Sequence, residues 1–174
     1  MIAFFDRLVA DSANRLAGYR LILIDDGSRD ATWTVIEGLT AQHPSVEGVR
    51  LSRNFGHQAA MLSGLSLAGA DVVLTMDADL QDDIEAVRAM IAAYEQGAHL
   101  ALGVRNDRAS DSRGKSGSAN AYYRLLRLMG IRTIENHADF RLMSRTALNA
   151  LLQYREVNLF LRGLIPTLGF PVTL

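Results

Sequence analysis

Apolar residues along the chain follow two alternating patterns. One is a short continuous apolar run, which is typical of a strand buried on both faces of a sheet. Such runs occupy residues 19–24, 46–51, 71–76 and 98–104. The other is an apolar position every three or four residues, which predicts a helix. It occurs over 2–16 and 57–68, around Trp33, Ile36 and Leu39, and around Ile84, Val87, Ile91 and Tyr94. Alternating strands and helices predict an α/β fold, with a mostly parallel sheet and helices on both faces.

Beyond residue 104 the pattern becomes less regular. We interpret the polar stretch 105–115 as a loop, because it is rich in Gly, Ser, Asp and Arg. The remaining stretches predict a helical stripe at 122–129, a strand or extended loop at 137–143, and short helices near 144–153 and 158–167. The chain contains no internal repeat and no stretch typical of a domain linker. We therefore expect residues 1–174 to form a single domain.

Charge is distributed unevenly, although the net charge is only -1. Residues 1–104 contain 7 basic and 14 acidic side chains, whereas residues 105–174 contain 11 basic and 5 acidic ones. The first part therefore suits cations and the second suits anions. The chain has no cysteine, which excludes disulfides and thiolate metal sites. It also has no apolar run of the roughly 18–20 residues that a membrane-spanning helix needs.

The first acidic pair of interest, Asp77 and Asp79, follows the third apolar run. Alternate residues of an extended chain point the same way, so both carboxylates could face one hard cation. Mg²⁺ and Mn²⁺ prefer such oxygen ligands and often share them with substrate phosphates. An alternative is that Asp79 and Asp82 only cap the next helix, in which Glu85 would complete a capping box.

A second acidic pair, Asp25 and Asp26, ends the first apolar run and is followed by Gly27. In parallel sheets ligands collect at the carboxyl ends of strands, and an acidic side chain there can bind ribose hydroxyls. We therefore interpret this pair as a candidate nucleoside site. The alternative is that Asp26 and Gly27 simply form a turn. The chain has neither a Gly-x-Gly-x-x-Gly fingerprint nor a P-loop, so phosphate binding by backbone alone is not indicated.

Several motifs together resemble glycosyltransferase family 2, in its polyprenyl-phosphate branch of dolichyl-phosphate mannose synthases and bacterial undecaprenyl-phosphate glycosyltransferases. The resemblance covers nearly the whole chain. The motifs are Asp25-Asp26-Gly27-Ser28-Arg29-Asp30, Arg53-Asn54-Phe55-Gly56-His57-Gln58, Asp77-Ala78-Asp79-Leu80-Gln81-Asp82, Gly103-Val104-Arg105 and Ala138-Asp139-Phe140-Arg141-Leu142.

This resemblance implies a GT-A type fold, which is Rossmann-like, and an enzyme that transfers a sugar with inversion. The donor would be a nucleoside-diphosphate sugar, the cofactor Mg²⁺ or Mn²⁺, and the acceptor a polyprenyl phosphate lipid. By position in the motifs, Asp25 and Asp26 would hold the nucleoside. Asp77, Asp79 and Gln81 would bind the metal and the diphosphate. Arg105 and Arg141 would lie near donor or acceptor phosphates, and Asp139 is a candidate general base.

The resemblance also sets expectations about organisation and location. Residues 1–104 would form the half that binds nucleotide sugar and metal, and residues 105–174 the acceptor half. Family members usually begin with a strand that this chain lacks, and many continue into membrane helices, so we expect a fragment shortened at both ends. The full-length protein would act at the cytoplasmic face of the cell membrane and contact the membrane surface. We expect no nucleic acid partner, and a homo-oligomer stays open.

The chemistry of the acceptor bears on the role of Asp139. A sugar hydroxyl has a high pKa and requires a general base. A phosphate monoester has a second pKa near ~6, so a lipid phosphate is already mostly a dianion and needs positive charge to position it. The arginine-rich later part of the chain therefore favours a lipid phosphate, and Asp139 could instead orient Arg141 or have a structural role. Two other functions stay open: transfer to a saccharide hydroxyl, and a catalytically silent domain that binds nucleotide sugars.

Overall fold

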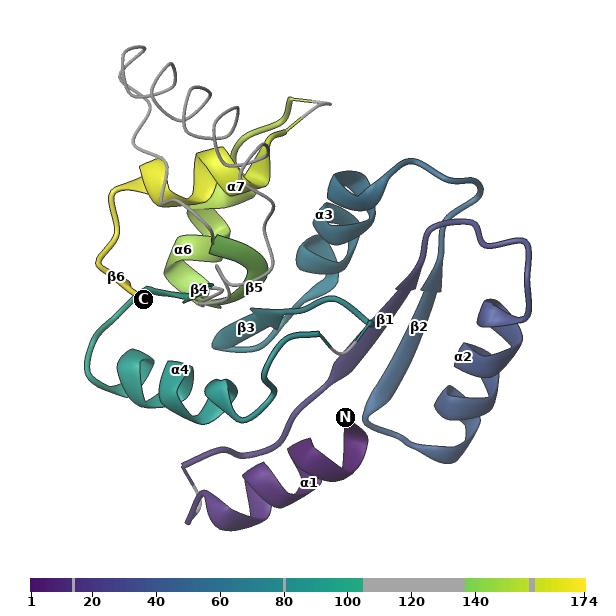
Figure 1. Cartoon of the computed structure of the whole chain (residues 1–174), viewed down its shortest axis with the longest axis horizontal. Coiled ribbons are helices and arrows are strands. Elements are labelled where there is room, and N and C mark those ends of the chain that lie inside the picture. The colour runs from purple at the N-terminus through teal and green to yellow at the C-terminus, as the bar shows by residue number, and fades with distance from the viewer. Residues whose placement is uncertain (14, 80, 105–136, 157–158) are drawn as a thin grey trace, which may run out of the picture. The chain divides into compact units, whose positions relative to one another are not determined.

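The computed structural model describes residues 1–174 except residues 14, 80, 105–136 and 157–158 (Figure 1). The chain divides into two compact units. We call Met1–Asp71 the N-terminal unit and Val72–Leu174 the C-terminal unit, and describe each by itself.

The N-terminal unit is a pair of parallel strands with helices packed against them (Figure 1). Strands β1 and β2 pair so that Leu21 lies opposite Val46 and Asp25 lies opposite Arg50. Helix α2 packs against β2, and helix α3 packs against β1. In chain order the elements are α1 (Ile2–Asp11), β1 (Leu21–Asp25), α2 (Thr32–Gln42), β2 (Val46–Arg50) and α3 (His57–Leu67).

The C-terminal unit contains a four-stranded sheet in the order β3-β5-β4-β6. Strand β5 is antiparallel to β3 and β4, and β6 is parallel to β4, so β3, β4 and β6 all run the same way. In chain order the elements are β3 (Val72–Thr75), α4 (Ala86–Glu95), β4 (Leu100–Val104), β5 (His137–Ser144), α6 (Arg145–Leu151), α7 (Leu161–Leu164), the 3-10 helix η1 (Ile165–Leu168) and β6 (Val172–Thr173).

Strand β5 forms the centre of the C-terminal core. Leu142 and Met143 are buried, and the neighbouring strand β4 buries Leu100 and Leu102. Helix α6 covers this core with side chains that have no exposed area: Ala147, Leu148 and Leu151. Ser144 caps α6 by accepting a hydrogen bond from the Ala147 N–H, which fixes where the helix begins. Strand β5 ends at Ser144, and helix α6 begins at the next residue because Ser144 is its N-cap.

Most of the predicted elements are confirmed, including the α/β class and the strand at 137–143 that the sequence left open. The predicted capping box is wrong. Helix α4 begins at Ala86, and its N-cap residue Glu85 makes no side-chain capping bond. Asp83 instead accepts a hydrogen bond from the Glu85 N–H and closes a turn ahead of the helix. In the described part of the chain, no helix is long and apolar enough to cross a membrane.

Candidate active site

The carboxylate of Asp25 is buried at the end of β1, with 1% of the residue exposed. Its Oδ1 accepts a hydrogen bond from the Ser28 N–H at 2.9 Å, and its Oδ2 lies 3.4 Å from Nε of Arg50. The strand register explains this ion pair, because Asp25 and Arg50 are opposite one another. Arg50 therefore offsets the repulsion that two adjacent carboxylates would otherwise cause.

Asp26 connects β1 to the loop that precedes α3. Its Oδ1 accepts a hydrogen bond from the Phe55 N–H at 2.7 Å, and its Oδ2 accepts one from the Gly56 N–H at 2.9 Å. Hydrogen bonds from N–H groups to a carboxylate are stronger than those between neutral groups. Asp26 thus fixes the loop formed by residues 53–56. The residues next to Asp26 in the sequence do not predict this contact. The nucleoside role of Asp25 and Asp26 stays a prediction.

Gly27 makes this loop contact sterically feasible. Its φ is +69°, and a Cβ added there would lie 2.4 Å from the carbonyl carbon of Arg53. Only glycine has the space and the conformational freedom that this position needs. The chain bends at Gly27, and the adjacent Asp26 holds a second loop in place, while the choice between a nucleoside site and a simple turn stays open.

We expect Gly27→Ala to lower the free energy of unfolding of the N-terminal unit by about 2–3 kcal/mol, from left-handed backbone strain and displacement of the 53–54 backbone. Urea unfolding followed by the fluorescence of Trp33, the single tryptophan, would measure this change. Gly69→Ala is the matched control, because an added Cβ there would meet nothing within 4 Å. Equal stability of the two variants would contradict this account of Gly27.

The residues predicted to bind metal follow β3. Asp77 is half-buried, whereas Asp79 and Gln81 are exposed. The strand ends at Thr75, and Asp79 lies in a turn and accepts a hydrogen bond from the Gln81 N–H at 3.1 Å. The argument from strand alternation therefore fails for Asp79, because the chain has already left the extended conformation. The capping alternative also fails, because α4 has its N-cap further along the chain, at Glu85.

The donor set on this loop suits a hard cation. Among the described residues there is no group of three or more His, Cys, Asp or Glu side chains that could hold a metal ion. Asp77 and Asp79 supply two carboxylates, and Gln81 adds an amide oxygen. Mg²⁺ commonly binds through one or two carboxylates, and keeps waters and substrate phosphates as its other ligands. These ligand types are ones that Mg²⁺ or Mn²⁺ accepts, and metal binding at this loop stays a prediction.

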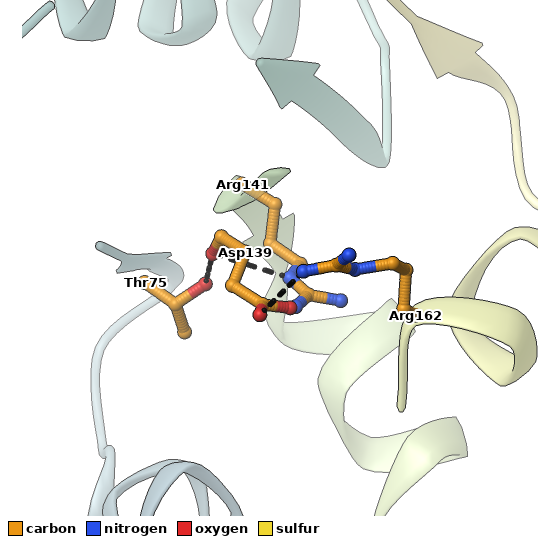
Figure 2. A network of polar contacts seen from close by, with 4 residues as sticks. All are labelled: Thr75, Asp139, Arg141 and Arg162. Carbon is orange, nitrogen blue, oxygen red and sulfur yellow. Dashed lines mark hydrogen bonds and ion pairs between the residues drawn. The ribbon is translucent and has the colours of Figure 1, made fainter. Parts of the chain in front are cut away.

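A second cluster of charges lies inside the C-terminal unit, on β5 and α7. Asp139 is 4% exposed and Arg141 has no exposed area. The Arg141 guanidinium contacts Oδ1 of Asp139, and Nη2 of Arg162 donates to Oδ2 at 2.9 Å. Figure 2 shows both guanidinium groups converging on this carboxylate. The Thr75 hydroxyl donates to the backbone carbonyl of Asp139 at 2.6 Å, which fixes this end of β5 against β3.

Burial lowers the pKa of the Arg141 guanidinium below its ordinary value. The Asp139 carboxylate opposes this shift, whereas the positive charge of Arg162 adds to it. Asp77 also raises the pKa of Arg141, although more weakly than Asp139. The candidate metal loop is therefore electrostatically coupled to the arginine cluster within one unit.

Among the remaining candidate residues, the structure describes Asp139 but not Arg105. Both oxygens of Asp139 bind arginines, which favours its orienting role over that of a general base. Arg162, on α7, belongs to the basic residues of the later part of the chain that the sequence suggests for a phosphate acceptor, but its contact with Asp139 was not predicted. It lies 23 positions from Asp139, and no local spacing signals their contact. Arg105 lies outside the described residues.

Comparison with known proteins gives the family. Residues 3–152 match Glycosyl transferase family 2. The chain is 41% identical over 167 residues to an uncharacterised glycosyltransferase, YkoT, of Bacillus subtilis, covering 95% of this chain and 48% of that protein. It is 38% identical over 150 residues to a bactoprenol glucosyl transferase of Shigella phage SfV, covering 86% of this chain and 49% of that protein. The chain therefore spans about half the length of these relatives. The family and GT-A type fold that the motifs predict are confirmed, and the chain belongs to glycosyl transferase family 2.

Proposed function

We propose that this protein transfers a sugar, with inversion, from a nucleoside-diphosphate sugar to a polyprenyl phosphate. The observation that carries this choice of acceptor is the Asp139 carboxylate held between Arg141 and Arg162. A hydroxyl acceptor needs a base, whereas a phosphate acceptor needs positive charge. This cluster supplies positive charge, and each carboxylate oxygen already binds a guanidinium. The similarity to a bactoprenol glucosyl transferase supports the same acceptor class.

The donor side of the proposal assigns roles to both acidic pairs. Asp25 and Asp26 would bind the nucleoside, with Asp26 also holding the 53–56 loop. Asp77, Asp79 and Gln81 would hold Mg²⁺ or Mn²⁺ against the diphosphate. A bound divalent cation stabilises the charge that develops on the leaving group. Arg141 would provide a fixed positive potential beside that loop, oriented by Asp139.

The proposal extends to organisation and location. Residues 1–104 would serve the donor and the metal, and residues 105–174, which include Arg105, would serve the acceptor. Because a polyprenyl phosphate resides in a bilayer, the full-length protein would act at the cytoplasmic face of the cell membrane. The excess of basic side chains in residues 105–174 suits an anionic membrane surface.

A transfer assay tests this function. The chain would be incubated with Mn²⁺, radiolabelled UDP- or GDP-sugars and undecaprenyl phosphate, with undecaprenol as the control lipid that lacks the phosphate. We expect label in the organic phase only with the phosphorylated lipid. Label in water-soluble saccharide would favour a hydroxyl acceptor instead. Metal-dependent donor binding without any transfer would favour a silent nucleotide-sugar-binding domain.

A further inference from the structure

Arg162 adds a positive charge to a buried ion pair that is already neutral. Asp139 and Arg141 are both buried and have opposite charges, so together they are neutral. Arg162 adds a second guanidinium to the same carboxylate, at 2.9 Å from Oδ2. The three side chains therefore carry a net positive charge. Two guanidinium groups thus share one carboxylate, and a further anion beside Arg162 would balance the remaining positive charge.

The position of Arg162 leaves it accessible to a ligand. Its side chain is 43% exposed, in contrast to the fully buried side chain of Arg141. A guanidinium has five N–H donors in a planar fork. Arg162 uses Nη2 for Asp139, and no other described residue binds its remaining N–H groups, which could therefore donate to an anion outside the core. Arg141 is buried, so it can attract such an anion only through the electrostatic potential of its charge.

An apolar side chain lies in the same turn as Arg162. Phe160 precedes α7 and is 52% exposed. Its ring lies over Gly163, where an added Cβ would approach the ring to 2.5 Å. Arg162 and Phe160 are thus both exposed in one short segment, and Gly163 leaves room for the ring. This pairing suits a phosphate that is joined to an apolar chain.

We propose that Arg162 is a phosphate-binding residue, held by Asp139 and supported by the buried charge of Arg141 (Figure 2). The group that it recognises is a phosphate, either the acceptor's monoester or the donor's diphosphate. Phe160 favours the acceptor. This inference rests on the proposed function for its biological ligand, but the recognition of phosphate can be tested without turnover.

Binding of farnesyl phosphate and of farnesol to the full chain would test the inference by calorimetry. The wild-type chain should prefer the phosphate form, and Arg162→Gln should weaken farnesyl phosphate binding about 10- to 100-fold with little effect on farnesol. Arg162→Lys should restore part of the affinity, because it keeps the charge but loses the planar fork. Arg155→Gln, at an exposed arginine of the same unit, should behave as wild type.

Binding of nucleoside diphosphates and the unfolding temperature distinguish the possible outcomes of this experiment. Weaker binding of UDP or GDP in Arg162→Gln, with farnesyl phosphate unaffected, would assign the phosphate to the donor. Unchanged binding of every phosphate ligand would overturn the inference. So would an equal loss for farnesol and farnesyl phosphate accompanied by a lower unfolding temperature, which marks a structural role. If the wild-type chain binds farnesyl phosphate through Arg162 but transfers no sugar, the proposed function fails and the phosphate site stands.

Discussion

Asp139→Ala is expected to lower the free energy of unfolding of the C-terminal unit by about 3–5 kcal/mol, because it leaves the buried charge of Arg141 without its carboxylate partner. Arg141 has no exposed area, so its charge is not solvated in the native fold. The loss is a large fraction of the stability of an ordinary domain, which is about 5–15 kcal/mol. Urea unfolding followed by circular dichroism, with hydrogen exchange of the β5 amides, would measure it.

The matched control removes both charges. Asp139→Leu combined with Arg141→Met should be much more stable than Asp139→Ala alone, because replacing a buried ion pair with apolar side chains costs little. Asp139→Asn should fall between them, since its amide oxygen can still accept a hydrogen bond from one guanidinium. If Asp139→Ala were as stable as wild type, the ion pair would not hold β5.

The same variants separate the two roles of Asp139. A general base predicts that Asp139→Asn keeps its fold and its affinity for phosphate but loses turnover. An orienting carboxylate predicts that stability and phosphate binding fall together, because both depend on where the guanidinium groups lie. The contacts to Arg141 and Arg162 favour the second outcome.

The positions of the acidic pairs could be predicted from sequence because they depend on local patterns. A continuous apolar run ends at a charged residue, and ligands collect at the carboxyl ends of the strands in parallel sheets. Asp25 does end β1, and Asp77 follows β3. The partners of Asp26 could not be predicted in this way. Its contacts are the backbone N–H groups of Phe55 and Gly56, about thirty positions away, and backbone groups carry no sequence signal.

The arginine cluster could not be predicted from the sequence for a related reason. The resemblance marked Asp139 and Arg141, but it could not give the antiparallel pairing of β5 with β3 and β4 that buries them. That pairing joins residues far apart in the chain, so no short window of sequence contains it. Composition alone also does not predict a fully buried arginine, because arginine is almost never buried unless it is paired. Arg162 is one of several basic residues that the sequence suggests for a phosphate, and its contact with the buried Asp139 distinguishes it from the others.

Removing the divalent cation, or either carboxylate that would hold it, is expected to reduce sugar transfer by about 10²–10³-fold, because a bound metal supplies several kcal/mol of charge stabilisation to the leaving diphosphate. EDTA should lower the activity to the same extent, and Mn²⁺ or Mg²⁺ should restore it. Asp77→Ala and Asp79→Ala are the informative variants, and initial rates at saturating donor would measure their effect. Asp83→Ala is the matched control, since Asp83 is an exposed acidic residue of the same segment that closes a turn.

The two carboxylates should also be distinguishable from one another. Asp79 is exposed and lies in a turn, so Asp79→Ala should weaken Mn²⁺ binding while leaving the free energy of unfolding unchanged. Asp77 is half-buried and raises the pKa of Arg141, so Asp77→Ala should weaken Mn²⁺ binding and also disturb the arginine cluster. Only Asp77→Ala should therefore alter phosphate binding in the absence of metal. Full Mn²⁺-dependent transfer by both Asp77→Ala and Asp79→Ala, lost on addition of EDTA, would exclude this loop as the metal site.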